Sequence, residues 1–206
     1  MLPAFELISP IVLAFPGKDG KYRNRQPASV IRRYLRVARA HHYLLLIDIQ
    51  PGRSTFMDET RALEPFLKEP DVGLALDPEW NMGRQGIPGE VIGSVGAGEI
   101  NQVSSYLAGI VKDEDLPEKL LVIHQFTPDM VRDKAKLVPR PELDTVLNSD
   151  GFGGFADKRA KYRELAPRTN RFDRGFKLFF QEDTGLMSPG QVLRLHPQPV
   201  DFVVYE

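Results

Sequence analysis

Two carboxylates and an indole stand together at the end of one apolar run of the sequence. The run covers residues 72–76, and Asp77-Pro78-Glu79-Trp80 follows it directly. If the run is a strand, its period of two places Asp77 and Glu79 on the same face. Two carboxyl groups on one face suit the cleavage of a glycosidic bond, because one can be held protonated while the other stays ionised. We therefore predict Glu79 as a general acid and Asp77 as a candidate partner.

Polar side chains also follow the other apolar runs of the chain. In a parallel β/α protein the carboxyl ends of the strands meet at one rim, so we expect these side chains to converge there. Some have a local structural explanation as well, since Asp150 before Gly151 is typical of a turn and Asp48 can bind backbone groups of the loop after it. The residues in question are Glu6, Asp48, Gln50, His124, Gln125, Asp150, Glu182 and, near the chain end, Tyr205.

The elements that would position these residues alternate along the chain. Apolar runs bounded by turn residues predict strands, and apolar residues at three- and four-residue spacing predict helices. Thr127-Pro128 and Ser188-Pro189 each have the form of an N-cap followed by proline in the first helical turn. The predicted strands are 3–8, 43–49, 72–77, 119–126, 144–149, 176–181 and 201–205; the predicted helices are 28–41, 58–68, 97–112, 156–165 and one after each of the two capping pairs.

This alternation predicts an α/β protein with a parallel sheet, folded as a single domain over residues 1–206. An open doubly wound sheet and a closed TIM-like (β/α) barrel both fit the order of elements. The barrel is favoured because no phosphate-binding glycine loop follows the first strand and because polar groups follow nearly every strand. Only seven strands are visible, so either the barrel has seven strands or an eighth element precedes Met1.

Composition excludes several classes of function. The chain has 206 residues, 42% of them hydrophobic, and a net charge of -1, so no positive field favours nucleic acid. It contains no cysteine, no apolar run long enough to span a membrane and no recognisable signal peptide at Met1. Paired-histidine metal motifs are also missing. A divalent metal would have to bind His124 together with Asp48, Asp77 or Glu79, so we predict no cofactor and keep a metal site as an alternative.

Aromatic residues accompany the predicted rim. Trp80 and Tyr205 fall at or beyond strand ends, and so do Phe126, Phe152 and Phe155. Flat rings can stack on sugar faces while acids bind the hydroxyl groups, although Phe152 and Phe155 can equally pack within their own loop. The loop over residues 78–96 is long, contains five glycines and follows the most acidic strand end, so we expect it to face the substrate.

Five stretches of the sequence resemble those of a barrel domain found in lipoproteins and secreted proteins of actinobacteria. The likeness spans nearly the whole chain and implies an extracytoplasmic setting, but it implies no particular activity. The stretches are Asp48-Ile49-Gln50-Pro51-Gly52-Arg53, Leu76-Asp77-Pro78-Glu79-Trp80, Val122-Ile123-His124-Gln125-Phe126-Thr127, Asp150-Gly151-Phe152-Gly153 and Lys177-Leu178-Phe179-Phe180. The predicted barrel and its acidic rim also resemble those of glycoside hydrolases in general. This is an analogy of fold and not a match of motifs.

The sequence thus predicts a glycosidase-like hydrolase of a polysaccharide. Glu79 is the expected general acid, Asp77 or Asp48 its partner, and His124 the residue that orients them. A metal-dependent hydrolase at the same rim and a catalytically inert carbohydrate-binding or cell-envelope module remain open. The expected substrate-binding residues are Glu6, Gln50, Trp80, Gln125, Asp150, Glu182 and Tyr205.

Overall fold

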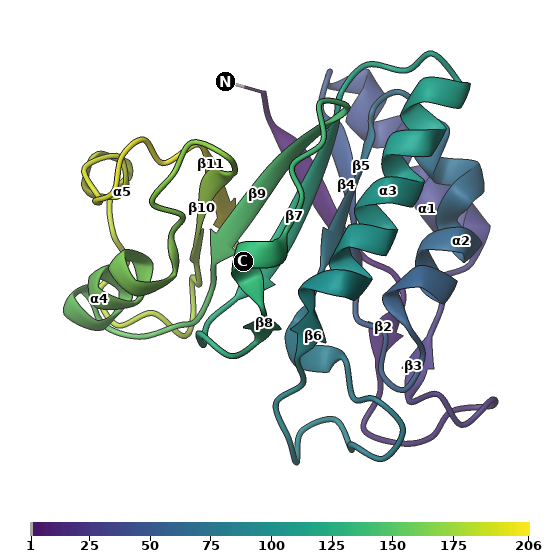
Figure 1. The fold of residues 1–206 in the computed structure, drawn as a ribbon, viewed down its shortest axis with the longest axis horizontal. Coiled ribbons are helices and arrows are strands. Elements are labelled where there is room, and N and C mark those ends of the chain that lie inside the picture. Colours follow the sequence, from purple (N-terminus) through teal and green to yellow (C-terminus); the bar gives the residue numbers. More distant parts are fainter. Residues whose placement is uncertain (1) are drawn as a thin grey trace.

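The computed structural model describes residues 2–206 and is built on one seven-stranded parallel sheet (Figure 1). The strand order is β1-β4-β5-β7-β9-β10-β11, so consecutive long strands are neighbours and helices cover the outer side. These strands are β1 (Ala4–Ile8), β4 (Leu44–Ile49), β5 (Val72–Leu76), β7 (Lys119–Gln125), β9 (Leu143–Ser149), β10 (Asp173–Leu178) and β11 (Phe202–Tyr205). The helices are α1 (Ala28–Ala40), α2 (Phe56–Leu67), α3 (Ala97–Asp113), α4 (Phe155–Leu165) and α5 (Pro189–Val192).

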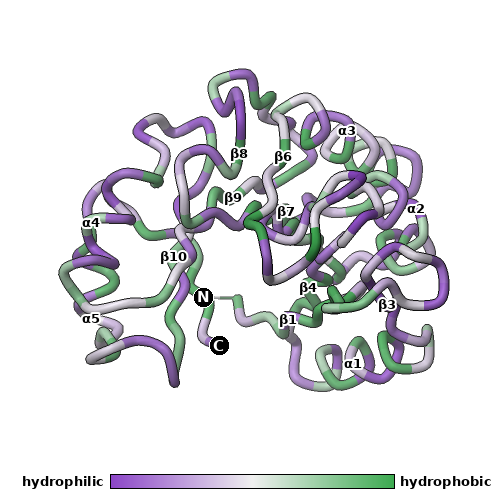
Figure 2. The backbone as a smooth tube through the Cα atoms, turned by 90° about the horizontal axis from the view of Figure 1, so that it is seen from below, coloured by the Kyte–Doolittle hydropathy of each residue, from purple (hydrophilic) through white to green (hydrophobic). Residues whose placement is uncertain are grey.

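The backbone of the sheet is strongly curled, as the view from below in Figure 2 shows. Nε2 of His124 on β7 lies 3.1 Å from Oε1 of Glu6 on β1, although β4 and β5 separate these strands in the sheet. Curling alone can bring them together. The edge strands β1 and β11 do not pair within residues 2–206, so the parallel α/β fold is confirmed but the predicted closed barrel is not.

Alternation along each strand gives the sheet two different faces. On the convex face, residues such as Leu45, Ile47 and Leu74 pack against α1, α2 and α3 in the main apolar core. On the concave face, the deepest layer consists of Leu46, Ala75, Val122 and Val146, against which Leu120 and Phe202 pack. A smaller core joins α4 and α5 to β10. The polar side chains at the C-terminal ends of the strands therefore lie above this apolar layer.

Two glycines allow the strands to approach closely inside the curl. A Cβ atom on Gly73 of β5 would lie 2.9 Å from the carbonyl oxygen of Leu120 on β7. A Cβ atom on Gly175 of β10 would lie 2.4 Å from Oδ1 of Asn148 on β9. Such contacts are shorter than van der Waals packing allows, so a side chain at Gly73 would collide with the backbone of β7 and one at Gly175 would displace the side chain of Asn148.

Most predicted elements lie within two residues of the observed ones, with two exceptions. The helix predicted to begin at Thr127-Pro128 is wrong. This segment instead forms a turn, the two-residue strand β8 (Val131–Arg132) and the 3₁₀ helix η2 (Lys134–Lys136). Met130 accepts a hydrogen bond from the backbone N–H of Val95, and Val131 pairs with Val95. These backbone groups are therefore not free to form a helix. The strand predicted at 176–181 is β10, which begins earlier, at Asp173.

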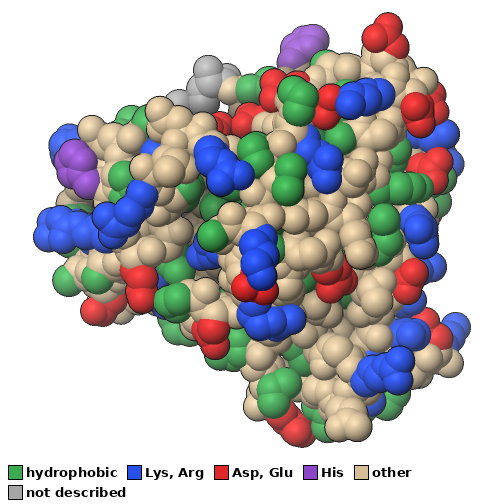
Figure 3. Space-filling view, in the orientation of Figure 1, with side chains coloured by type: hydrophobic (Ala, Val, Ile, Leu, Met, Phe, Trp, Pro, Cys, Tyr) green, Lys and Arg blue, Asp and Glu red, His purple; other side chains and the backbone are tan. Residues whose placement is uncertain are grey.

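Short elements surround the C-terminal ends of the strands, at the bottom of Figure 1. They are β2 (Ile11–Val12) with β3 (Arg23–Asn24), the 3₁₀ helix η1 (Pro78–Trp80), and β6 (Val95–Gly96) with β8. Acidic and basic side chains are interspersed on the face shown in Figure 3, which agrees with the near-zero net charge. Among residues 2–206, no helix has the length and apolar character needed to cross a membrane.

Candidate functional site

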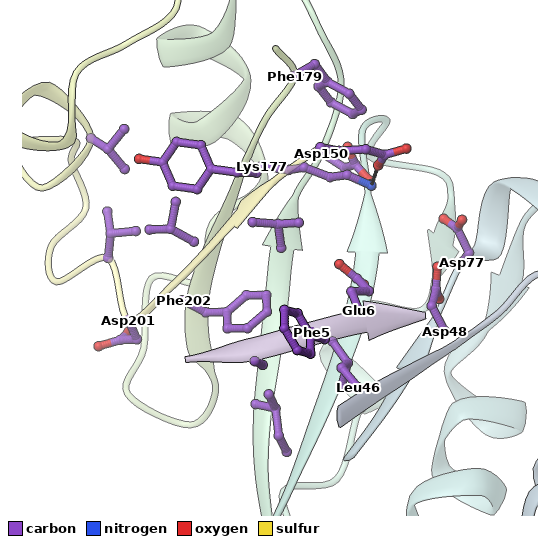
Figure 4. Close-up of a pocket in the computed structure, with 18 of the residues that line it drawn as sticks. Phe5, Glu6, Leu46, Asp48, Asp77, Asp150, Lys177, Phe179, Asp201 and Phe202 are labelled. Atoms are coloured by element: carbon purple, nitrogen blue, oxygen red, sulfur yellow. Dashed lines mark ion pairs between the residues drawn. The ribbon is translucent and has the colours of Figure 1, made fainter. Parts of the chain in front are cut away.

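The hollow of the sheet is a cavity of about 1430 Å³. Figure 4 shows Glu6, Asp48, Asp77 and Asp150 gathered toward one end of it, with Asp201 at the opposite end. The crowded end is where the strands terminate, as expected for a rim of parallel strands. Of the predicted site residues, the cavity is lined by Glu6, Asp48, Gln50, Asp77, Glu79, Trp80, Asp150 and Tyr205.

His124 lies at the centre of this end, fully enclosed at 1% exposure. Its Nε2 lies 3.1 Å from Oε1 of Glu6, and its Nδ1 lies 3.2 Å from Oδ2 of Asp150. Asn148, the neighbour of His124 in the sheet, places its Nδ2 3.1 Å from the same Nδ1. Both ring nitrogens therefore have partners, and the imidazole joins β1 to β9 through the interior.

Lys177 on β10 completes the network, and the sequence analysis missed it. Its Nζ lies 3.5 Å from Oδ2 of Asp150 and 2.6 Å from Oε2 of Glu206. The sequence signal that could have identified it is the alternation along β10. With the strand beginning at Asp173, Gly175, Lys177 and Phe179 lie on its concave face. The cation beside Asp150 compensates part of the negative charge that the strand ends bring together.

Partners set the charge of three groups in this network. Burial favours the neutral form of His124, but its hydrogen bonds with Asp150 and Glu6 outweigh burial and raise the pKa well above its ordinary value. Burial alone would raise the pKa of Asp150, yet the contacts with His124 and Lys177 lower it to about 2. Glu6 follows the same pattern, and its pKa is lowered. Glu6 and Asp150 are therefore ionised and His124 is cationic at neutral pH.

Asp77 and Glu79 titrate in the opposite direction. Burial raises the pKa of Asp77 to about 6, while Nε2 of Gln50 donates a hydrogen bond of 3.1 Å to its Oδ2. Burial, together with the negative charges of Asp77 and Asp150, raises the pKa of Glu79 to about 8. At pH 7 Glu79 is therefore protonated while Asp77 is largely ionised, which is the division of roles that acid–base catalysis requires.

Asp48 differs from these acids because one of its carboxyl oxygens has no partner within residues 2–206. Its Oδ1 is buried and makes no hydrogen bond with any atom of residues 2–206. Burial and the nearby charge of Asp77 raise its pKa well above the usual range. One carboxylate oxygen of Asp48, one of Glu6 and a ring nitrogen of His124 all lie within 4.8 Å of one another. Within residues 2–206, these three residues form the group that could hold a metal ion.

Two predicted substrate-binding residues lie outside the cavity. Gln125 follows His124 on β7 and so points to the convex side, where its Nε2 donates to the carbonyl oxygen of Leu165 and its Oε1 accepts from Lys134. Glu182 is exposed in the loop after β10 and does not line the cavity, because β10 ends three residues earlier than expected. The side-chain alternation of a strand, rather than proximity in sequence, decides which groups reach the interior.

Aromatic side chains surround the open end of the cavity. Trp80, Phe126, Phe152 and Tyr205 line it, whereas Phe155 does not. A second hollow of about 180 Å³ adjoins it and is lined by Glu79, Trp80, Phe126 and residues 89–92 of the long loop. The loop is anchored beside Glu79, since the N–H of Gly93 donates to the Glu79 carbonyl oxygen at 2.6 Å. Part of this loop therefore borders the candidate site.

The cavity thus combines a charged network, two carboxyl groups with separated pKa values and a rim of aromatic rings. Comparison with protein-family models, with curated proteins and with solved structures gives no match for this chain.

Proposed function

We propose that this protein is a glycosidase-like hydrolase in which Glu79 is the general acid and Asp77 is its ionised partner. The observation that supports the proposal is the pair itself. Both groups line the same cavity, and their pKa values are raised to about 8 and about 6, so neutral pH lies between them. Separated pKa values in neighbouring carboxyl groups are typical of acid–base assignments in enzymes that cleave glycosidic bonds.

In this mechanism Glu79 donates its proton to the oxygen of the leaving sugar as the glycosidic bond breaks. Asp77, oriented by the amide of Gln50, either activates water or stabilises the positive charge that develops on the sugar ring. Asp77 suits this role better than Asp48, because burial and the charge of Asp77 favour the protonated form of Asp48. The imidazole of His124 has no free nitrogen, so its part is to hold Asp150 and Glu6 in place.

The size and lining of the cavity favour a polysaccharide over a small substrate. A volume of about 1430 Å³ exceeds the roughly 300–1,000 Å³ of pockets for drug-sized ligands. Trp80 and Phe126 line both hollows together with Glu79, Phe152 lines the larger one, and the smaller hollow extends the lined surface along residues 89–92. The resemblance to secreted actinobacterial proteins suggests an extracytoplasmic glycan as the substrate class.

The test compares the wild-type chain with Glu79→Gln on a panel of polysaccharides. Turnover is measured as the release of reducing ends. The amide keeps the shape of Glu79 but cannot donate the proton, so kcat should fall by about 10²–10⁴-fold. Binding of the same glycan should persist. Glu164→Gln is a matched control, since Glu164 is exposed on α4 and lines neither hollow.

Undiminished hydrolysis by Glu79→Gln would remove Glu79 from the mechanism. A wild-type chain that binds glycans but never cleaves them would instead support the inert carbohydrate-binding module. The group formed by Glu6, Asp48 and His124 favours one further candidate, a metal-dependent hydrolase. Loss of turnover in a chelator and its recovery with a divalent ion would support that candidate.

A further inference from the structure

We propose that Glu6, Asp48 and His124 form a binding site for one divalent transition-metal ion, Zn²⁺ or Mn²⁺, on the concave face of the sheet. The site uses neither residue of the proposed acid–base pair, Asp77 and Glu79, so failure of the one proposal can be distinguished from failure of the other. Its three residues come from three different strands, β1, β4 and β7, and the curl of the sheet brings them together.

The spacing of the ligand atoms suits one ion. One atom from each residue lies within 4.8 Å of the other two, and Nε2 of His124 is 3.1 Å from Oε1 of Glu6. Ligands about 2.1 Å from a shared zinc ion are themselves roughly 3–4 Å apart. Small movements of the Asp48 and Glu6 side chains are therefore enough to close the site.

The unpartnered oxygen of Asp48 is a second, independent indication. Asp48 is 3% exposed, and its Oδ1 has no hydrogen-bond partner among residues 2–206. A buried carboxylate oxygen without a partner costs stability, so such atoms are rare in folded proteins unless a water or an ion satisfies them. An ion shared with Glu6 and His124 would supply the missing partner.

The groups behind His124 are arranged as metal-binding histidines require. Oδ2 of Asp150 lies 3.2 Å from Nδ1 of His124, so it can hold the Nδ1 proton, while an ion bound at Nε2 would displace the proton that Nε2 shares with Glu6. Nζ of Lys177 holds the same Asp150 oxygen at 3.5 Å. A carboxylate behind the imidazole fixes both its tautomer and its direction, which for Nε2 is toward Glu6.

The ligand types favour zinc or manganese. One imidazole and two carboxylates form a mixed nitrogen and oxygen set, whereas Mg²⁺ and Ca²⁺ prefer oxygen ligands alone. Glu6 and Asp48 line the cavity of about 1430 Å³, so the remaining coordination positions of the ion face open space. Water or a substrate hydroxyl group could occupy these positions.

The test uses the full chain after treatment with a chelator and measures binding of Zn²⁺ by calorimetry and of Mn²⁺ by electron paramagnetic resonance. The wild-type chain should bind about one equivalent, and pulsed spectra of bound Mn²⁺ should show coupling to one histidine nitrogen. Asp48→Asn should weaken binding at least about tenfold, since even loss of a group behind a ligand costs about 10–100-fold. Asp144→Asn is the control, because Asp144 lines the same cavity but is exposed at the other end of its strand.

Glu79→Gln should bind the ion as the wild-type chain does, which separates this site from the proposed acid. If Asp48→Asn does not fold, Glu6→Gln makes the same test at another ligand. The proposal is overturned if the wild-type chain shows no saturable binding. It is equally overturned if Asp48→Asn binds as tightly as the wild-type chain, or if bound Mn²⁺ has no nitrogen coupling, since either result places the ion elsewhere.

Discussion

Glu59 and Asp48 are both buried acids, yet their surroundings are opposite. Glu59, on the outer helix α2, is fully buried and accepts hydrogen bonds from Nε of Arg23 at 2.9 Å and Nε of Arg25 at 2.7 Å. Asp48, on the concave face of β4, has a buried oxygen with no partner within residues 2–206. Burial would raise the pKa of Glu59, but its arginine partners lower it, whereas burial and Asp77 raise the pKa of Asp48.

This contrast separates an acid that supports the fold from an acid that the fold must tolerate. A paired carboxylate is stabilised by the structure around it, and removing either partner leaves the other charge buried. An unpaired one lowers stability and persists in proteins mainly where it serves a site. Opposite effects on stability should therefore follow from the same chemical change at Glu59 and at Asp48.

The largest effect is expected from Glu59→Gln. Removing the charge leaves the guanidinium of Arg23, whose side chain is 11% exposed, without its main buried partner. Breaking a buried pair costs about 3–5 kcal/mol, and we expect about 3 kcal/mol here because Arg25 can turn toward water. Urea denaturation at pH 7 measures the free energy of unfolding.

The control for this change is Asp19→Asn, because Asp19 pairs with the same Arg23 at 2.7 Å but is 47% exposed. Exposed pairs contribute at most about 1 kcal/mol. Equal losses in the two variants would contradict the distinction between the two kinds of acid. The lowered pKa of Glu59 also implies that its contribution is present above its unfolded pKa and is lost as the pH falls through the folded value.

The order of elements could be predicted from sequence because turn residues interrupt the apolar runs at regular intervals. Runs such as residues 44–49 and 72–76 are covered on both faces and so are apolar throughout, apart from the acids at their ends. Closure of the sheet could not be predicted, since it depends on whether β1 and β11 meet, and no local pattern encodes that distance. The helix predicted after Thr127-Pro128 does not form, because Val131 pairs with Val95, which is distant in sequence.

Sequence alone could predict which side chains reach the cavity where this depends only on the position of a strand end. Asp77 and Glu79 line the cavity, as expected where an apolar run ends abruptly in acid. Lys177 was missed because a lysine within an apolar strand resembles an edge or surface residue, and only the register of β10 reveals that it points inward. The pairing of His124 with Glu6 was equally invisible, since 118 residues separate them.

An effect of similar size, spread over several pH units, is expected on the pH dependence of stability. The pKa of Glu79 is raised from 4.5 to about 8, so between these pH values the folded state holds a proton that the unfolded state has lost. Stability from this group is therefore complete below pH ~4.5 and falls as the pH rises toward ~8, by at most about 1.4 kcal/mol per pH unit. Glu79→Gln should flatten the decline of unfolding free energy between pH 5 and 8, as measured in urea.

Glu90→Gln provides the comparison, because Glu90 is exposed in the adjoining loop and its removal should leave the wild-type slope unchanged. If the slope of Glu79→Gln matched that of the wild-type chain, Glu79 would titrate near its ordinary value. The separation of the Asp77 and Glu79 pKa values would then be lost, and with it the main support for Glu79 as the acid.

The smallest effect, and the one that completes the comparison, is expected from Asp48→Asn in the presence of a chelator. The change removes a carboxyl group whose ionised form is disfavoured by burial and by the charge of Asp77. It breaks no hydrogen bond at Oδ1. The new amide can donate to the ionised carboxylate of Glu6, so we expect a gain of about 1 kcal/mol in unfolding free energy. The sign is thus opposite to that of Glu59→Gln.

With Zn²⁺ added, the wild-type chain should be stabilised and the variant should not, so their order of stability should reverse. A loss of stability in the chelator would show that Asp48 has a partner after all, and that the two buried acids do not differ in kind.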